Sequence, residues 1–179
     1  MTSLILGYIG TAIAIVGFQL KKQWQIIISQ CLSNLLVALS YLFLDLSKIT
    51  GGAMCLVGGI HTLINYFFLR KDKNPPRYIA VIFFFAYALV SAGVLYMAGS
   101  VRIPYDLLPT LGSVLFLVGV SSTNPRFTRI IFLFNMIIWT TYDFMAAPVA
   151  WANLVTHIGI LISVIVGIIR YDILKPKEN

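Results

Sequence analysis

The chain has 179 residues, of which 59% are hydrophobic and only 11% are charged, and its mean hydropathy is +0.91. A soluble fold of this length cannot bury so much apolar surface. The composition therefore excludes a soluble domain and predicts an all-α integral membrane protein whose first partner is the lipid bilayer.

Seven apolar runs of spanning length follow one another along the chain. Each is close to the ~20 residues that a helix needs to cross a hydrocarbon core. We expect seven transmembrane helices over residues 4–20, 24–44, 50–70, 77–99, 105–122, 127–146 and 149–170. The first run has no positive charge on its N-terminal side and no small-residue cleavage pattern, so we expect a retained helix and not a signal peptide.

The formal net charge of +7 is distributed along the chain and forms no patch, so nucleic acid is not an expected partner. If the helices alternate in direction, eleven of the thirteen Lys and Arg residues fall on one side of the membrane. Only Lys48 and Arg102 fall on the other side. The positive-inside rule then predicts an outside N-terminus and a cytoplasmic C-terminus.

Residues 9–72 are repeated in residues 111–172. The offset decreases from 102 to 100 in one-residue steps, and each step lies in a connection between apolar runs, where deletions are tolerated. The alternative is a chance match between two apolar, glycine-rich stretches. The matched pairs are Gly10 and Gly112, Gly17 and Gly119, Asn34 and Asn135, Tyr41 and Tyr142, Gly59 and Gly159, Arg70 and Arg170, and Asp72 and Asp172.

A duplication of this kind predicts a three-one-three arrangement of helices. The boundaries would be a first three-helix repeat at 1–72, a linker helix region at 73–104, a second three-helix repeat at 105–172 and a basic cytoplasmic tail at 173–179. Because three is odd, the single linker helix gives both repeats the same orientation. The halves are then parallel repeats related by an axis along the membrane normal.

Charged and reactive groups are scarce inside the apolar runs. The six acidic residues lie at or beyond predicted helix ends: Asp45, Asp72, Asp106, Asp143, Asp172 and Glu178. Without a carboxylate at mid-membrane depth, a sodium site, a carboxylate proton relay and an intramembrane aspartyl protease are disfavoured. Hydrolase signatures are missing as well. We therefore expect no enzyme, no cofactor and no metal site.

Two cysteines, Cys31 and Cys55, lie in the second and third runs. Their depths differ by roughly 12 Å at 1.5 Å per residue, which is beyond disulfide reach. We expect both to be packing residues.

His61 and His157 lie near the middle of the third and seventh runs, which are equivalent helices of the two halves. Steps of four residues place Asn65 on the face of His61 and Asn153 on the face of His157. The depth order from outside is Asn153, His157, His61, Asn65, at about 6 Å per step. We hypothesise that these four residues bind solute along a polar path between the halves. The alternative is that each histidine bonds a neighbouring carbonyl and joins two helices.

Aromatic and polar residues of the sixth run add further candidates. Trp139 can stack on a ring of the solute or serve only in packing. Tyr142 and Asp143 lie near the predicted outer interface, where they form an entry gate or act as interfacial anchors. Asn34 and Asn135 are expected to hold helices together.

Neutral amides, imidazoles and aromatics suit a neutral polyhydroxylated or heterocyclic solute better than an ion. Facilitated diffusion by rocking of the two halves is the leading hypothesis, and a histidine would add proton sensitivity because imidazole titrates near neutral pH. Two other classes stay open, namely a non-transporting scaffold or accessory subunit and a receptor that binds a ligand without moving it. The identity of the solute and the presence of a homo-oligomer are open as well.

The three-one-three layout resembles that of the SWEET and SemiSWEET sugar transporters and their PQ-loop relatives. Trp139-Thr140-Thr141-Tyr142 resembles the Trp-x-x-Tyr stretch of their second repeat helix. Pro148, followed by Asn153, resembles the approach to the pocket asparagine of their third repeat helix. The resemblance implies transport of a sugar-like solute.

The first repeat departs from that pattern. Ala38 stands at the position equivalent to Trp139, and Ala53 at the position equivalent to Asn153. Phe18-Gln19 and Val120-Ser121 replace the Pro-Gln pair of that family, so the resemblance does not extend to a helix hinge at that proline.

Over nearly the whole chain, the sequence is similar to the YgjV family of small bacterial inner membrane proteins. The stretch Leu107-Leu108-Pro109-Thr110-Leu111-Gly112 is the most specific part of the match. This resemblance implies a multi-pass protein of the bacterial inner (plasma) membrane, and it implies no particular activity.

Overall fold

The computed structural model describes residues 2–42, 49–98, 107–145 and 151–174, which form helices and turns without a β-strand. The elements are α1 (Thr2–Gly17), α2 (Gln23–Leu42), α3 (Ile49–Leu69), α4 (Arg77–Ala98), α5 (Leu108–Val120), α6 (Pro125–Met145), α7 (Trp151–Ile168) and a π-helical turn, η3 (Ile169–Ile173). Each of the seven predicted helices is present in these residues. Lys48, Arg102, Pro148 and the tail from residue 175 lie outside them.

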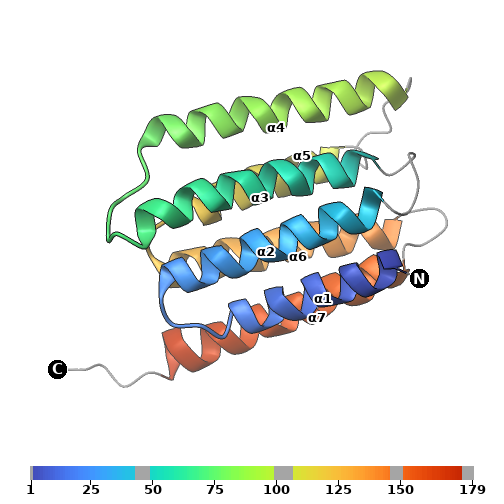
Figure 1. Cartoon of the computed structure of the whole chain (residues 1–179). Coiled ribbons are helices and arrows are strands. Elements are labelled where there is room, and N and C mark those ends of the chain that lie inside the picture. The colour runs from blue at the N-terminus through green and yellow to red at the C-terminus, as the bar shows by residue number, and fades with distance from the viewer. Residues whose placement is uncertain (1, 43–48, 99–106, 146–150, 175–179) are drawn as a thin grey trace.

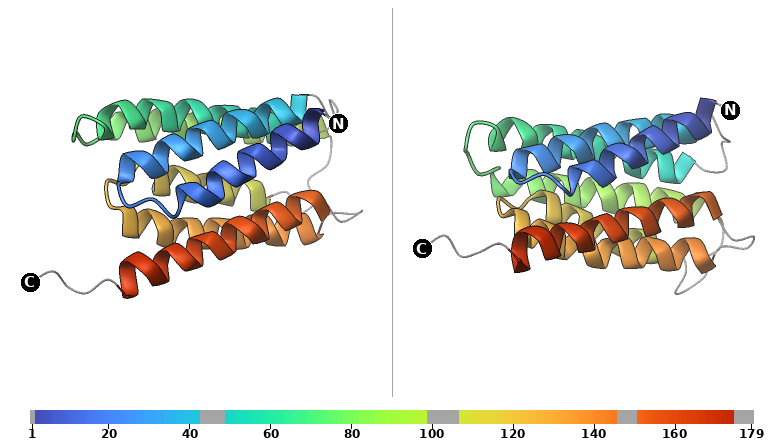
Figure 2. Two further views of the ribbon diagram at one scale, coloured as in Figure 1. Left: turned by 60° about the horizontal axis from the view of Figure 1, so that its bottom comes forward. Right: turned by 90° about the horizontal axis from the view of Figure 1, so that it is seen from below.

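The helices are arranged in two layers that share their long direction (Figure 1). In one layer α2 packs between α1 and α3, and in the other α6 packs between α5 and α7. The layers meet where α1 contacts α7 and α3 contacts α5, while α4 covers one edge by packing on α3 and α5. Figure 2 shows the two layers from two further sides. Among the described residues, the middle helices α2 and α6 do not pack closely on each other, and the space between them is the site described below.

Small residues bring neighbouring helices of a layer together. A Cβ atom built on Gly17 of α1 would lie 1.9 Å from the Ser29 hydroxyl oxygen of α2, and one built on Gly119 of α5 would lie 2.8 Å from the Phe132 ring of α6. Glycine, without a Cβ atom, leaves room for these side chains of the neighbouring helix. Both layers therefore cross their first two helices at a glycine near the end of the first helix.

The outer surface of the bundle is apolar. Side chains that are about half exposed or more include Phe67 of α3, Phe85 and Leu89 of α4, and Ile162 of α7. A continuous apolar exterior of this kind is incompatible with water on every side and matches the lipid environment expected from the composition.

The apolar character differs between the helices more than expected. Two helices of the described part are long and apolar enough to cross a membrane by length and composition, over Gly52–Leu69 and Asn153–Ile173. Shorter apolar stretches occur in α1, α4 and α5. The middle helices α2 and α6 belong to neither group because each carries a row of buried polar residues. Seven spans were predicted; the structure has seven helices in its described part, and two of them meet the length and composition of a membrane span.

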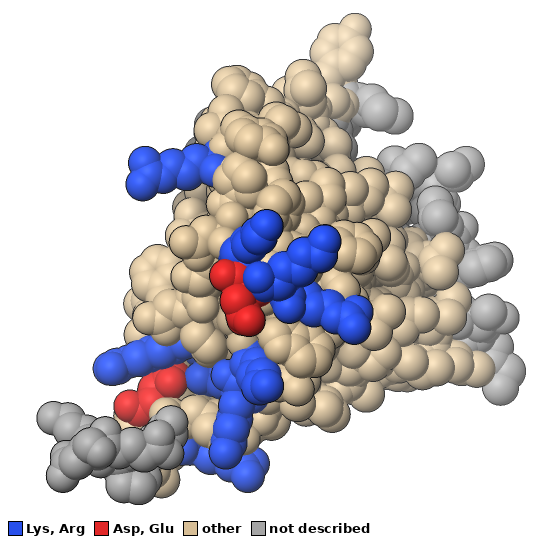
Figure 3. Space-filling model, turned by 60° about the vertical axis from the view of Figure 1, so that its left-hand side comes forward, with Lys and Arg blue, Asp and Glu red and all other residues tan. Residues whose placement is uncertain are grey.

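Every Lys and Arg of the described residues lies at one end of the bundle, which we call the basic end. Figure 3 looks onto this end, where the blue side chains gather around a few acidic ones. These residues are Lys21, Lys22, Arg70, Lys71, Lys73, Arg77, Arg126, Arg129 and Arg170. The chain begins at the opposite end, which we call the N-terminal end (Figure 1).

Candidate functional site

A cavity of about 250 Å³ lies between the two layers and is lined by residues from all seven helices. Its walls combine amides and hydroxyls with aromatic rings. The polar side chains that line it are Thr11, Gln30, Ser33, Asn34, Ser40, Ser113, Asn135, Asn153, Thr156 and His157, and the aromatic ones are Tyr8, Tyr87, Phe116, Phe132 and Trp139. At about 30 Å³ for each water molecule, this volume corresponds to roughly eight waters or one small solute.

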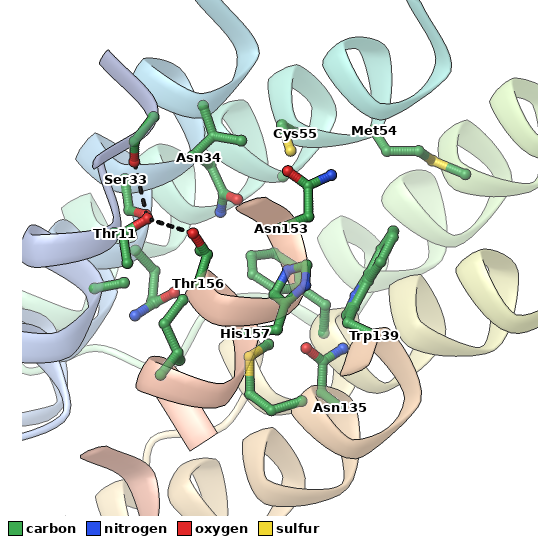
Figure 4. Close-up of a pocket in the computed structure, with 18 of the residues that line it drawn as sticks. Thr11, Ser33, Asn34, Met54, Cys55, Asn135, Trp139, Asn153, Thr156 and His157 are labelled. Carbon is green, nitrogen blue, oxygen red and sulfur yellow. Dashed lines mark hydrogen bonds between the residues drawn. The ribbon is translucent and has the colours of Figure 1, made fainter. Parts of the chain in front are cut away.

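Helical spacing explains why these residues meet. On α2, the positions Gln30, Ser33, Asn34 and Val37 are three or four residues apart and share one face. The same spacing recurs on α7 at Asn153, Thr156, His157 and Ile160. Figure 4 shows side chains of α1, α2, α6 and α7 directed into the shared space. The cavity is therefore built from one face of α2 and one face of α7, together with side chains of the neighbouring helices.

Some of the polar groups around the cavity are satisfied within the protein. Asn135 Nδ2 donates to the carbonyl oxygen of Gly112 at 2.5 Å, which ties α6 to α5. The Thr11 hydroxyl donates to the carbonyl of Gly7 at 2.8 Å and lies 3.5 Å from the Thr156 hydroxyl of the other layer. Asn34 and Asn135, which we expected to hold helices together, thus both belong to the cavity wall.

The imidazole of His157 is part of the cavity wall, and the carboxyl group of Asp143 contacts it from behind the wall. His157 Nδ1 lies 2.5 Å from Asp143 Oδ2, and the exposed fractions of the two side chains are 19% and 2%. The Trp139 ring stacks on the His157 ring with centroids 5.7 Å apart, and its other neighbour Tyr142 makes an edge contact, also at 5.7 Å. Trp139 and His157 therefore line the cavity, and Asp143 orients His157 from behind.

The expected gate residues are placed differently from the prediction. Asp143 lies in the last turn of α6, as expected, but its carboxylate is buried in the bundle and paired with His157. A signal for this pair exists in the sequence, because Asp143 precedes and His157 follows the same short connection between two apolar runs. Tyr142 contacts Trp139 and is partly exposed.

His61 and Asn65 are separate from the cavity. Both are fully buried, and the His61 ring stacks on Phe83 of α4 with centroids 4.3 Å apart. Asn65 Nδ2 donates to the carbonyl of Val120 at 2.9 Å and lies 3.1 Å from His61 Nε2. The structure brings Asn153, His157 and Trp139 together and does not bring His61 and Asn65 to them. The physical reason is that α4 and the end of α5 cover this face of α3.

Packed side chains close the bundle between the cavity and the basic end. Phe18, directly after α1, and Phe132 of α6 meet across the layers with ring centroids 5.0 Å apart. Val120 and Val164 are fully buried in the same cluster, and Phe132 also forms part of the cavity wall. The cavity therefore lies toward the N-terminal end of the bundle.

Arg129 lies beyond this apolar cluster, and only 2% of its side chain is exposed. Its guanidinium group donates to the Leu20 carbonyl at 2.8 Å and to the Asp172 carboxylate at 3.1 Å, and it lies over the Tyr171 ring at 5.0 Å. The sequence pattern counted Arg129 among the cytoplasmic surface charges. Arg129 lies one helical turn after the start of α6, whereas Arg126 lies at its first turn and is exposed. This deeper position was the sequence signal that Arg129 is buried.

The described part of the chain is a helical bundle with exposed apolar side chains, and two of its helices are long and apolar enough to cross a membrane. A sequence model of the Imp-YgjV family, described as a bacterial inner membrane protein, matches residues 1–175. The chain therefore belongs to the Imp-YgjV family, and its location is the bacterial inner membrane. No curated protein and no solved structure matches the chain. The predicted family and location are confirmed, and the likeness to SWEET transporters stays a prediction.

Proposed function

We propose that this protein is a non-enzymatic transporter that carries a small neutral polar solute through the space between its two helical layers. The observation that carries the proposal is a cavity of about 250 Å³, lined in part by amide and hydroxyl side chains, between the layers of an otherwise apolar membrane bundle. Polar groups inside a membrane protein are costly and usually mark the path of a substrate.

The two layers support the proposed three-one-three arrangement of parallel repeats. Each layer places its second helix in the middle, and α4 stands outside both layers. Gly17 packs against Ser29 and Gln30, and Gly119 packs against Ile131 and Phe132, which occupy equivalent or adjacent positions in the sequence alignment of the halves. In Figure 1 the helices α1 and α5 run in the same direction, as do α2 and α6.

The proposed orientation has the basic end in the cytoplasm. This end carries every Lys and Arg of the described residues, and the positive-inside rule assigns such an end to the cytoplasmic side. The cavity then lies on the periplasmic half of the bundle, and the structure corresponds to a state closed toward the cytoplasm.

The proposed mechanism is rocking of one layer against the other. Closure at the basic end depends on contacts between layers, including the Phe18 and Phe132 rings and the bonds of Arg129 to the carbonyls of Phe18 and Leu20. Separation of these contacts would open the cavity toward the cytoplasm. The described residues that line the cavity include no Lys, Arg, Asp or Glu, and the Asp143 carboxylate behind the wall is paired with His157, which favours an uncharged solute.

The test is uptake of a panel of labelled sugars, nucleobases, nucleosides and small amides by liposomes that contain the purified protein. The variant Asn153→Ala alters the cavity wall, and Asn74→Ala, in the exposed connection before α4, is its matched control. We expect saturable uptake that Asn153→Ala reduces and Asn74→Ala leaves unchanged. Saturable binding without uptake would instead establish a receptor, and neither binding nor uptake would leave a scaffold role.

A further inference from the structure

The surface of α3 has a small niche above Gly58, inside the cavity. A Cβ atom built on Gly58 would lie 3.4 Å from Asn34 Nδ2, 3.4 Å from Tyr87 Oη and 3.3 Å from Phe116 Cε1. These three side chains come from α2, α4 and α5, so three different helices direct polar or ring-edge atoms at one point of a fourth. Glycine leaves this point empty of side-chain atoms.

The groups that surround the niche are hydrogen-bond donors. Asn34 Nδ2 and Tyr87 Oη are buried, and neither has a hydrogen-bond partner within the described part of the chain. An amide nitrogen can only donate, and the edge of an aromatic ring is its positively polarised part. A group placed between them must therefore be an acceptor, and Tyr87 then donates its hydroxyl proton to it.

Two other atoms of the cavity wall have no partner within the described residues. Gln30 Nε2 is a further donor. Asn135 Oδ1 is an acceptor, and this assignment is secure because the Nδ2 atom of the same amide donates to the Gly112 carbonyl. Residues that line the cavity thus contain three buried donors and one buried acceptor without a partner among the described residues. Buried polar groups without partners are rare in folded proteins, and a bound ligand is a common reason for them.

We propose that the niche above Gly58 is an oxygen-acceptor subsite, and that the solute is an uncharged compound with carbonyl-type oxygens and at least one N–H group. This class includes lactams, ureides and pyrimidine-type rings. A carbonyl oxygen accepts two hydrogen bonds and brings no donor of its own, whereas each hydroxyl of a polyol adds a proton that needs another acceptor. The inference rests on the proposed function, because it names the solute class of the same cavity.

The test compares two probes, uracil and myo-inositol, in binding to the purified protein and in uptake by liposomes. We expect uracil to bind and to be taken up in preference to myo-inositol. Tyr87→Phe removes one donor and should weaken uracil binding about tenfold, as expected for one lost hydrogen bond. Gly58→Ala fills the niche and should weaken binding at least as much.

Matched controls lie on α4, the helix that also carries Tyr87. Tyr78→Phe makes the same change at an exposed tyrosine, and Gly93→Ala places a methyl group where nothing lies within 4 Å. Both controls should leave binding unchanged. Tyr87→Phe is nearly isosteric, so it keeps the test valid if Gly58→Ala fails to fold.

The outcomes separate this inference from the proposed function. Saturable uptake that is equal in Tyr87→Phe and wild type would overturn the subsite and leave the transporter standing. Preference for myo-inositol would overturn the carbonyl class. If the wild-type protein neither binds nor transports any member of the full panel, the proposed function fails, and the subsite fails with it.

Discussion

Asp143 has its carboxylate inside the bundle although the residue lies only one turn from the end of α6. The pair with His157 explains how this buried carboxyl group is accommodated, since the two side chains are 2.5 Å apart and that of Asp143 is 2% exposed. A buried charge that loses its partner is strongly destabilising, whereas removal of both partners costs less. The pair therefore joins α6 to α7 and also fixes the position of His157, a residue of the cavity wall.

A double-mutant cycle measures this coupling. We expect His157→Ala to lower the free energy of unfolding by about 3 kcal/mol, because Asp143 is left buried and unpaired. The double variant His157→Ala, Asp143→Ala should cost clearly less than the sum of the two single changes. Thermal unfolding of the detergent-solubilised proteins gives the comparison, and strictly additive effects would contradict a direct pair.

The two candidate asparagines, Asn65 and Asn153, should behave in opposite ways. Asn65 is fully buried and donates to the Val120 carbonyl at 2.9 Å, so Asn65→Ala should cost about 1–3 kcal/mol of stability. Asn153 lines the cavity, so Asn153→Ala should raise the KM for uptake with little change in Tm. The combination of Tm and KM for each variant checks this, and a raised KM with an unchanged Tm for Asn65→Ala would return that residue to the solute path.

At the scale of helices, close approach at glycine sets the geometry of each layer. Gly17 permits α1 to lie against Ser29 of α2, and Gly112 permits α5 to lie against the Trp139 indole of α6, where a Cβ would be 2.8 Å from Nε1. The contact at Gly112 positions a ring of the cavity wall. Helix packing and the shape of the site are therefore linked through small residues.

Gly17→Ala tests the packing of α1 on α2. The new methyl group would overlap the Ser29 side chain, so we expect a loss of about 1–3 kcal/mol in stability. Gly93→Ala is the control, and it should be neutral or stabilise by up to about 1 kcal/mol through helix propensity. Equal Tm values for the two variants would show that the layer does not depend on this contact.

Helices were predictable from the sequence because apolar runs and their breaks report directly on helix length in a membrane. The same hydropathy pattern hid the character of α2 and α6, where Gln30, Asn34 and Asn135 alternate with apolar residues that face outward. It also could not show that α4 covers His61. That contact depends on where a helix without a repeat partner docks, and hydropathy does not encode docking.

At the scale of the molecule, the bundle is loose around the cavity and tightly packed toward the basic end. Arg129 joins the end of α1, the start of α6 and the η3 turn through the Leu20 carbonyl and the Asp172 carboxylate. Tyr171 adds a bond from its hydroxyl to the Gln19 carbonyl at 2.8 Å. These contacts are the polar part of the closure that transport would have to break.

Arg129→Met removes this tie and leaves Asp172 without its partner. We expect a loss of about 3–5 kcal/mol in stability, since Asp172 has only 7% of its side chain exposed. Arg126→Met, one turn earlier and exposed, is the matched control and should change stability by less than about 0.5 kcal/mol. Thermal unfolding separates the two, and similar Tm values would show that Arg129 is not a structural tie.

The site was partly predictable from the sequence. Asn153, His157 and Trp139 stand out because strongly polar or aromatic groups are few in apolar helices, and the structure places all three at the cavity. Thr11 and Thr156 do not stand out, because short hydroxyl side chains are common in membrane helices and only their meeting across the layers gives them significance. A local sequence pattern does not show which residues of distant helices meet.

The most direct test of the account uses Cys55, a native residue of the cavity wall, in a Cys31→Ser background. A membrane-impermeant thiol reagent is applied to right-side-out and to inside-out inner-membrane vesicles. We predict that Cys55 is modified from the periplasmic side, that modification from the cytoplasmic side is much slower, and that a transported solute slows the reaction. Equal modification from both sides, or faster modification from the cytoplasmic side, would contradict a cavity that faces away from the basic end.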